Sequence, residues 1–259
     1  MIIDGFMFNN ELDILEMRLE ELYPVVDRFV LVQSWQNFRG NPKELSFHKG
    51  EKRWEQYADK IDQVNIGMTG VEGDAWAKEQ FQRNVIGEIA KVWSKAPDDI
   101  LIISDVDEIP KRHVIESASM FHHGLDDGPC GISMKMYYYS LNVRKGEGEW
   151  DACRILKMRD LTTAQEIRHS EPLISLAYEG RGGWHYSYLG DDQFISDKLK
   201  AFSHSELDTP EVHAKIADNR AALLDPYNHG EQLHIEEFDW AKAPHAVRNN
   251  PEYWRKYIA

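Results

Sequence analysis

The sequence has few cysteines and no long apolar stretch. Cys130 and Cys153 are its only cysteines, too few for a disulfide scaffold and without the C-x-x-C spacing of zinc or thiol redox sites. We therefore expect two buried free thiols. Because no uncharged apolar run approaches about 18 residues, and no basic segment precedes an apolar one at the N-terminus, the sequence predicts neither a membrane span nor a signal peptide and favours a cytoplasmic location.

Basic residues are also outnumbered. Lys and Arg total 30 against 44 Asp and Glu, a formal net charge of -14, which repels nucleic acid and so argues against it as a partner. The chain has no Gly/Ser-rich or Pro-rich tract that would mark a linker, while 42% of its residues are hydrophobic. The expectation is a single domain over residues 1–259, and the oligomeric state stays open.

Apolar periodicity predicts an α/β fold. Apolar runs at residues 2–8 and 29–32 flank leucines at helical spacing, the pattern of a βαβ unit. A second helix is expected after Asp74, with four apolar residues on one face: Phe81, Val85, Ile89 and Val92. Further strands are expected at 131–140 and 153–158, and further helices at 191–202 and 209–220.

An acidic pair follows the most apolar run of the chain. Residues 100–103 predict a central strand buried on both faces, and Asp105 and Asp107 come directly after it. Ligands of open α/β sheets bind beyond the carboxyl ends of the strands. Two carboxylates there can hold one hard divalent cation, which stabilises a diphosphate leaving group. The triplet alone is also typical of a solvated turn, and Asp107 and Glu108 before Pro110 have a second interpretation as a helix cap.

Two later segments carry further candidates. His185 follows two glycines and is a possible metal ligand, although one histidine among 11 is more often structural. Residues 191–206 offer several carboxylates that can deprotonate an acceptor hydroxyl. We select Glu206 and Asp192 as candidate general bases.

Six blocks of the sequence resemble glycosyltransferase family 17, in that family's order. The blocks are residues 8–13, 25–32, 40–43, 105–110, 183–187 and 202–206. The characterised members of this family are β-1,4-mannosyl-glycoprotein β-1,4-N-acetylglucosaminyltransferases. Gln33 and the loop at 35–38 depart from the expected pattern, where a Glu and a Thr-Phe pair are usual.

The resemblance implies a nucleotide-sugar transferase fold of the GT-A type, with a mixed, mostly parallel central sheet flanked by helices. It also implies UDP-GlcNAc as donor, a saccharide acceptor, inversion at the anomeric carbon, and Mn2+ (or Mg2+) at Asp105 and Asp107. Our own hypothesis from the residues adds His185 as a third ligand. Residues 207–259 are then a mainly helical extension packed on the domain. The candidates for donor recognition are Asn10, Glu11, Glu79, Arg83 and Asp105.

Two other functions remain open on the residues alone. Asp105 and Asp107 after a buried strand also fit a phosphatase of the haloacid dehalogenase type, although that family normally places its motif on the first strand. The 8 Trp and 11 Tyr also suit a non-catalytic carbohydrate-binding protein, because aromatic faces stack on sugars.

Overall fold

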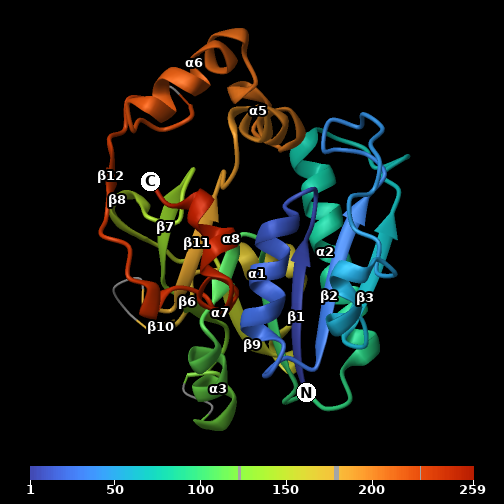
Figure 1. Cartoon of the computed structure of the whole chain (residues 1–259). Coiled ribbons are helices and arrows are strands. Elements are labelled where there is room, and N and C mark those ends of the chain that lie inside the picture. The colour runs from blue at the N-terminus through green and yellow to red at the C-terminus, as the bar shows by residue number, and fades with distance from the viewer. Residues whose placement is uncertain (122–123, 178–180, 228) are drawn as a thin grey trace.

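Two β-sheets form the centre of the computed structural model, which describes residues 1–121, 124–177, 181–227 and 229–259 (Figure 1). Within these residues the first sheet has the strand order β10-β6-β9-β4-β1-β2-β3 and the second the order β12-β8-β7-β11-β5. β1 (Ile2–Met7) is parallel to β2 (Arg28–Ser34) and β4 (Ile100–Asp105), and β2 is parallel to β3 (Ile61–Ile66). β9 (Arg154–Lys157) is antiparallel to β4. The mixed, mostly parallel central sheet is confirmed.

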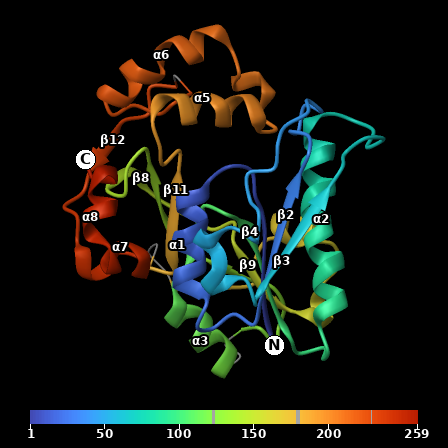
Figure 2. The ribbon, with the colours of Figure 1, turned by 45° about the vertical axis from the view of Figure 1, so that its right-hand side comes forward.

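Helices cover both faces of the first sheet (Figure 2). On one face Phe29 and Leu31 of β2 belong to the core that contains the apolar residues of α1 (Leu12–Leu22). On the other face Val30 and Val32 pack with α2 (Ala75–Trp93) and α4 (Ala164–His169). Successive strand residues point to opposite faces, so β1, β2 and β4 each contribute side chains to the two hydrophobic cores on either side of the sheet. The run at 100–103 is buried on both faces, as expected.

The buried face of α2 differs from the sequence prediction. Phe81 and Val92, both on the expected face, are 39% and 77% exposed. The residues buried instead are Gln82, Arg83, Ile86, Gly87 and Ala90. Gln82 and Arg83 turn inward because each has a polar partner there: Gln82 donates to a carbonyl oxygen of β2, and Arg83 donates to Asp105. Because polar residues point inward here, the spacing of apolar residues in the sequence does not show which face of α2 is buried.

Two of the places where the chain passes from the first sheet to the second bear on the sequence predictions. Residues 131–140, predicted as one strand, form two: β6 (Cys130–Ile132) in the first sheet and β7 (Met134–Tyr138) in the second. The second crossing is the turn between β4 and β5 (Glu108–Pro110), which carries the acidic pair. α3 (Arg112–Phe121) begins after Pro110. Asp107 and Glu108 therefore cap no helix, and the capping interpretation is wrong.

The second sheet and the C-terminal segments enclose the region beyond β1 and β4. β11 (Gly183–Ser187) lies between β7 and β5, and β8 (Val143–Trp150) and β12 (Leu233–Ile235) follow outward from β7. α5 (Asp192–Ala201) and α6 (Pro210–Ala221) lie above the carboxyl ends of the central strands (Figure 1).

The remaining elements complete the two ends of the molecule. β10 (Ser175–Leu176) is the edge strand beside β6, and α7 (His245–Asn249) packs on α1 and leads to α8 (Pro251–Trp254). Across the described residues, no helix combines the length and apolarity that a membrane crossing requires.

Candidate active site

A cavity of 380 Å³ opens at the carboxyl ends of β1 and β4, where the acidic pair lies. This is the expected place for a ligand in an α/β sheet. Its acidic, basic and histidine lining residues come from both sheets and from several helices and loops: Glu11, Lys43, Glu79, Arg83, Asp105, Asp107, Arg168, His169, His185, Lys198 and His204.

Arg18 of α1 fixes the turn that carries the acidic pair. Its side chain is fully buried, and its Nη2 is 2.5 Å from Asp4 Oδ1. Its Nη1 donates to the carbonyl oxygens of Asp105, at 3.1 Å, and Glu108, at 2.6 Å. Since a guanidinium has five donors in one plane, a single side chain holds both sides of the turn. The conformation of the acidic pair is thus set from within the core.

Two arginines hold the carboxylate of Asp105. Arg83 of α2 lies 3.2 Å from Oδ1 and Arg168 of α4 lies 3.0 Å from Oδ2. Arg168 also makes two contacts of 2.5 Å with the fully buried Glu108, which accepts from the indole of Trp150 as well. Burial alone would raise the pKa of Asp105, but Arg168 and then Arg83 outweigh it and hold that pKa below its ordinary value. Asp105 is therefore ionised.

Lys198 of α5 holds the carboxylate of Asp107. Its Nζ is 2.7 Å from Asp107 Oδ2 and 3.5 Å from Glu11 Oε1, and His185 Nε2 lies 3.5 Å from Asp107 Oδ1. Burial again favours a raised pKa for Asp107, but Lys198 and His185 reverse the effect and lower it. The same contacts raise the pKa of Lys198 against the effect of its burial. The pair is a salt bridge at any ordinary pH.

This arrangement does not fit a divalent cation. All four carboxylate oxygens of Asp105 and Asp107 already face a nitrogen of a basic side chain. Within the described ranges, no group of three or more His, Cys, Asp or Glu side chains is arranged to hold a metal ion. A metal at Asp105, Asp107 and His185 would require Lys198 to move away first, because carboxylate oxygens are the ligands that Mg2+ or Mn2+ needs.

Three nitrogen atoms of the cavity residues lack a partner. Lys43 Nζ, Arg83 Nε and His185 Nδ1 are buried and have no hydrogen-bond partner in the described part of the chain. Buried polar atoms are rarely left unpaired in proteins, and a ligand is one common reason for an exception. Burial lowers the pKa of Lys43, with Glu11 opposing that effect. The cavity therefore offers unpaired donors beside a fixed acidic pair, which suits an anionic, oxygen-rich ligand.

Most, but not all, of the predicted site residues line this cavity. Glu11, Glu79, Arg83, Asp105, Asp107 and His185 do. Asn10 does not, and its backbone N–H donates to Glu11 Oε2 at 3.1 Å. Asp192 pairs with Arg220 at 3.0 Å, outside the lining.

Glu206 also lies outside the lining, but it contacts a residue within it. Its carboxylate is 2.7 Å from Nδ1 of His204, and His204 lines the cavity. The catalytic roles of Asp192 and Glu206 stay predictions.

Sequence reasoning did not select Lys43, Arg168, Lys198 or His204. Lys43 and His204 lie within the blocks at 40–43 and 202–206, so the resemblance was an available signal for them. Lys198 and Arg168 reach the acidic pair from helices 91 and 63 residues further along the chain. No local pattern marks such contacts.

The fold and the site define an α/β domain with a mixed central sheet and a carboxylate pair in a cavity lined by basic side chains at the strand ends. The chain belongs to glycosyltransferase family 17, whose family model matches residues 1–219.

Curated relatives in this family are the rat and human proteins named beta-1,4-mannosyl-glycoprotein 4-beta-N-acetylglucosaminyltransferase. Each is 31% identical to this chain over 117 residues, a match that covers 43% of this chain and 22% of the relative. The matched part is thus under a quarter of either relative.

Similar solved structures are more distant. One is a 4-diphosphocytidyl-2C-methyl-D-erythritol synthase, at 11% identity and a TM-score of 0.41, covering 76% of this chain and 96% of that one. Another is S. aureus TarS 1-349, at 10% identity and a TM-score of 0.37, covering 77% of this chain and 64% of that one. Neither likeness contributes to the assignment.

Proposed function

We propose that this chain is a glycosyltransferase that moves N-acetylglucosamine from UDP-GlcNAc to a saccharide acceptor with inversion at the anomeric carbon. The observation that carries the proposal is the set of unpaired buried nitrogens, Lys43 Nζ and Arg83 Nε, beside the acidic pair of a family 17 chain. The printed names of the curated relatives support N-acetylglucosamine as the sugar. Membership of this family also argues against the haloacid dehalogenase alternative.

The cations of the cavity stabilise the leaving group. As the bond between the sugar C1 and the UDP oxygen breaks, negative charge develops on the diphosphate, and fixed positive groups lower the energy of that state. Lys43 and Arg83 donate to the diphosphate oxygens. Lys198 adds positive charge next to Asp107, where its Nζ is already held at 2.7 Å. Mn2+ or Mg2+ at Asp105, Asp107 and His185 stays a sequence prediction, and no step of this proposal depends on it.

The acceptor is activated by His204, with Glu206 as a positioning residue. Glu206 engages Nδ1 of His204, which leaves Nε2 with a free lone pair. The acceptor hydroxyl attacks C1 and loses its proton to Nε2 as UDP departs from the opposite face. One bond to C1 forms as the other breaks, so the configuration inverts. The rings of Trp76 and Phe202, 4.5 and 5.5 Å from that of His204, offer apolar faces for the acceptor sugar.

Donor titration tests this function. Calorimetry measures the binding of UDP-GlcNAc, UDP-Glc and UDP-GalNAc, each with Mn2+ and with EDTA. The proteins compared are the wild type, Lys43→Met and Lys91→Met. Lys91 is the matched control because, among the described residues, its ion pair is with Glu88 on the exposed side of α2. Loss of one charged hydrogen bond predicts donor binding about tenfold weaker in Lys43→Met and unchanged in Lys91→Met. A wild type that binds no UDP-sugar but releases phosphate from simple phosphoesters would overturn the proposal.

A further inference from the structure

A second cavity, of 680 Å³, lies on the other face of the second sheet. In β11, His185 and Ser187 line the first cavity, whereas Trp184 and Tyr186 line the second. β7 divides in the same way, with Met136 on one side and Lys135 on the other. The sheet therefore separates the two cavities, and a ligand in the second is not the group that attacks the donor sugar.

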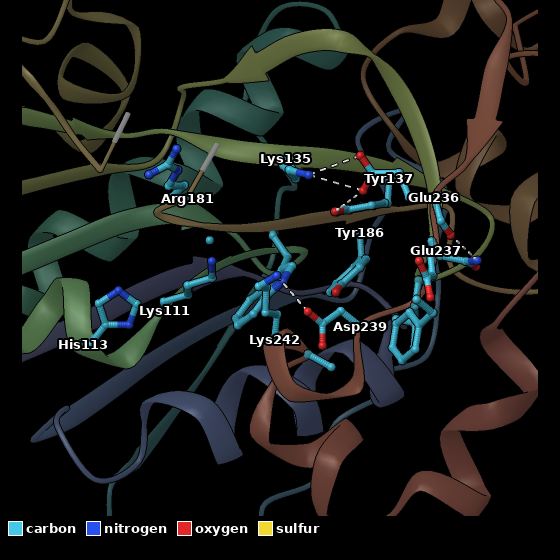
Figure 3. Close-up of a pocket in the computed structure, with 16 residues that line it drawn as sticks. Lys111, His113, Lys135, Tyr137, Arg181, Tyr186, Glu236, Glu237, Asp239 and Lys242 are labelled. Carbon is cyan, nitrogen blue, oxygen red and sulfur yellow. Dashed lines mark hydrogen bonds and ion pairs between the residues drawn. The ribbon is translucent and has the colours of Figure 1, made fainter. Parts of the chain in front are cut away.

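One side of this cavity is basic. Lys111 and Arg181 lie on that side, as Figure 3 shows, and Lys135 and Lys242 lie between them and the opposite wall, each paired with an acidic residue. Burial lowers the pKa of Lys111, Glu21 opposes this, and the three other cations of the cavity lower it further. The cations are thus close enough to repel one another. In a chain with a net charge of -14, such a cluster is a local exception that an anion would stabilise.

Lys111 differs from Lys135 and Lys242 in its partners. Lys135 is 3.2 Å from Glu236, and Lys242 is 2.8 Å from Asp239. Lys111 forms no ion pair within the described ranges, and its Nζ lies 5.1 Å from the ring centroid of Trp184. A cation–π contact leaves the ammonium free to donate hydrogen bonds to a ligand.

The opposite wall is acidic, and its Glu236 is already neutralised. Glu236 contacts Lys135, Arg144 and the hydroxyl of Tyr137. Its carboxylate oxygens are therefore not available to balance a second positive charge, but they and the exposed Glu237 can accept hydrogen bonds from hydroxyls. A ligand with a positive group gains little at Glu236, whereas one with an anionic end and a neutral, hydroxyl-bearing body matches both walls.

We propose that this cavity binds an anionic saccharide, with the phosphate or carboxylate of the sugar at Lys111, Lys135 and Arg181 and its hydroxyls toward Glu236 and Glu237. The volume is within the usual range of small-molecule sites, about 300–1,000 Å³. Its acidic wall comes from residues 236–243, beyond the segment that the family model matches. The site is separate from the donor cavity and does not depend on the function proposed above.

Titration with N-acetylglucosamine 6-phosphate and glucuronic acid tests the site. Binding is followed by protein-detected NMR against N-acetylglucosamine and inorganic phosphate as reference probes, for the wild type, Lys111→Gln and the control Lys91→Gln. We expect both anionic sugars to bind better than either reference and to shift the indole signal of Trp184. In Lys111→Gln their binding should weaken about tenfold.

Three results would overturn the proposal. N-acetylglucosamine binding as well as its 6-phosphate would remove the role of the cations. Inorganic phosphate binding as well as the sugar phosphate would show an anion site without saccharide recognition. Equal weakening in Lys91→Gln and Lys111→Gln would show a general effect of net charge. Because the donor is absent from these titrations, they succeed or fail independently of glycosyl transfer.

Discussion

Lys198 is the residue on which the charge balance of the candidate active site depends. It reaches from α5 to Asp107 and Glu11, the latter on the loop before α1, and its Nζ is within 3.5 Å of both carboxylates. A divalent cation at Asp107 would compete with this ammonium for the same oxygens. Whether the carboxylate of Asp107 binds an ammonium group or a metal ion therefore depends on the Lys198 side chain, and this dependence can be tested directly.

Lys198→Met should bind Mn2+ more tightly than the wild type, because two carboxylates lose their cationic partner and become available as ligands. Glycosyl transfer without added metal should fall at least tenfold, since the variant lacks a positive charge beside the leaving group. Electron paramagnetic resonance measures free Mn2+, and UDP release measures turnover. Lys200→Met is the control, because in the part of the chain that the structure describes Lys200 forms its ion pair with Asp197 on the surface of α5. Equal Mn2+ affinity in the wild type and Lys198→Met would show that the lysine and the metal do not compete.

The two cysteines give a second prediction at this scale. Both are free and buried, as the sequence predicted, and burial raises the pKa of Cys130 to about 11. Little thiolate exists at about pH 8, and the thiolate is the reactive form. Ellman's reagent should thus label neither thiol of the folded protein within minutes but both in guanidinium chloride. Rapid labelling of the native protein would contradict the burial of both side chains.

At the scale of elements, the sequence predicts best what depends on neighbours in the chain. The apolar runs of β1, β2 and β4 appear as expected, because a strand buried on both faces needs no partner to be recognised. The buried face of α2 was predicted only in part. Val85 and Ile89 pack against the core as expected, but Gln82 and Arg83 point inward to contacts far along the chain, while Phe81 and Val92 are exposed. The crossing between β6 and β7 was missed for a similar reason, since an unbroken apolar run does not show which sheet each half joins. The site followed the same rule: the acidic pair was found, and its partners Lys198 and Arg168 were not.

The packing of α2 on β1 allows a test of close approach. A Cβ added to Gly5 would lie 2.1 Å from Cγ2 of Ile86, whereas one added to Gly50 would meet nothing within 4 Å. Gly5→Ala should therefore lower the free energy of unfolding by about 1–3 kcal/mol, the usual cost of overpacking. Gly50→Ala should change it by less than about 0.5 kcal/mol. Urea denaturation followed by circular dichroism compares both variants with the wild type, and equal midpoints would show that α2 moves aside without cost.

At the scale of the whole molecule, Glu21 joins the two ends of the chain. From α1 it accepts hydrogen bonds from the backbone and the ring of His245 in α7, at 3.0 and 2.6 Å, and from the backbone N–H of Arg112 at 3.0 Å. Burial favours a raised pKa for Glu21, but these hydrogen bonds outweigh it and lower the pKa below its ordinary value of 4.5. Its ionised form therefore stabilises the attachment of the C-terminal segment to α1.

This attachment should weaken in acid. A carboxyl group with a lowered pKa in the folded state contributes stability that is present above its ordinary pKa and is lost as the pH falls toward the folded pKa. The free energy of unfolding of the wild type should thus fall below about pH 4.5, and Glu21→Gln should show a smaller fall. Glu88→Gln, which changes an exposed carboxylate of α2, should keep the slope of the wild type. If the free energy of unfolding fell with pH equally steeply in Glu21→Gln and in the wild type, the acid sensitivity would belong to other groups.

The position of β11 between the two cavities has a practical consequence for engineering. Trp184 and Tyr186 face one cavity, and His185 and Ser187 face the other. Substitutions at alternate positions of this strand can therefore redesign the recognition of one ligand and leave that of the other intact. An inserted residue would do the opposite, because a shift of one position turns every following side chain to the other face. The strand acts as a partition whose two sides can change separately, provided that its register is kept.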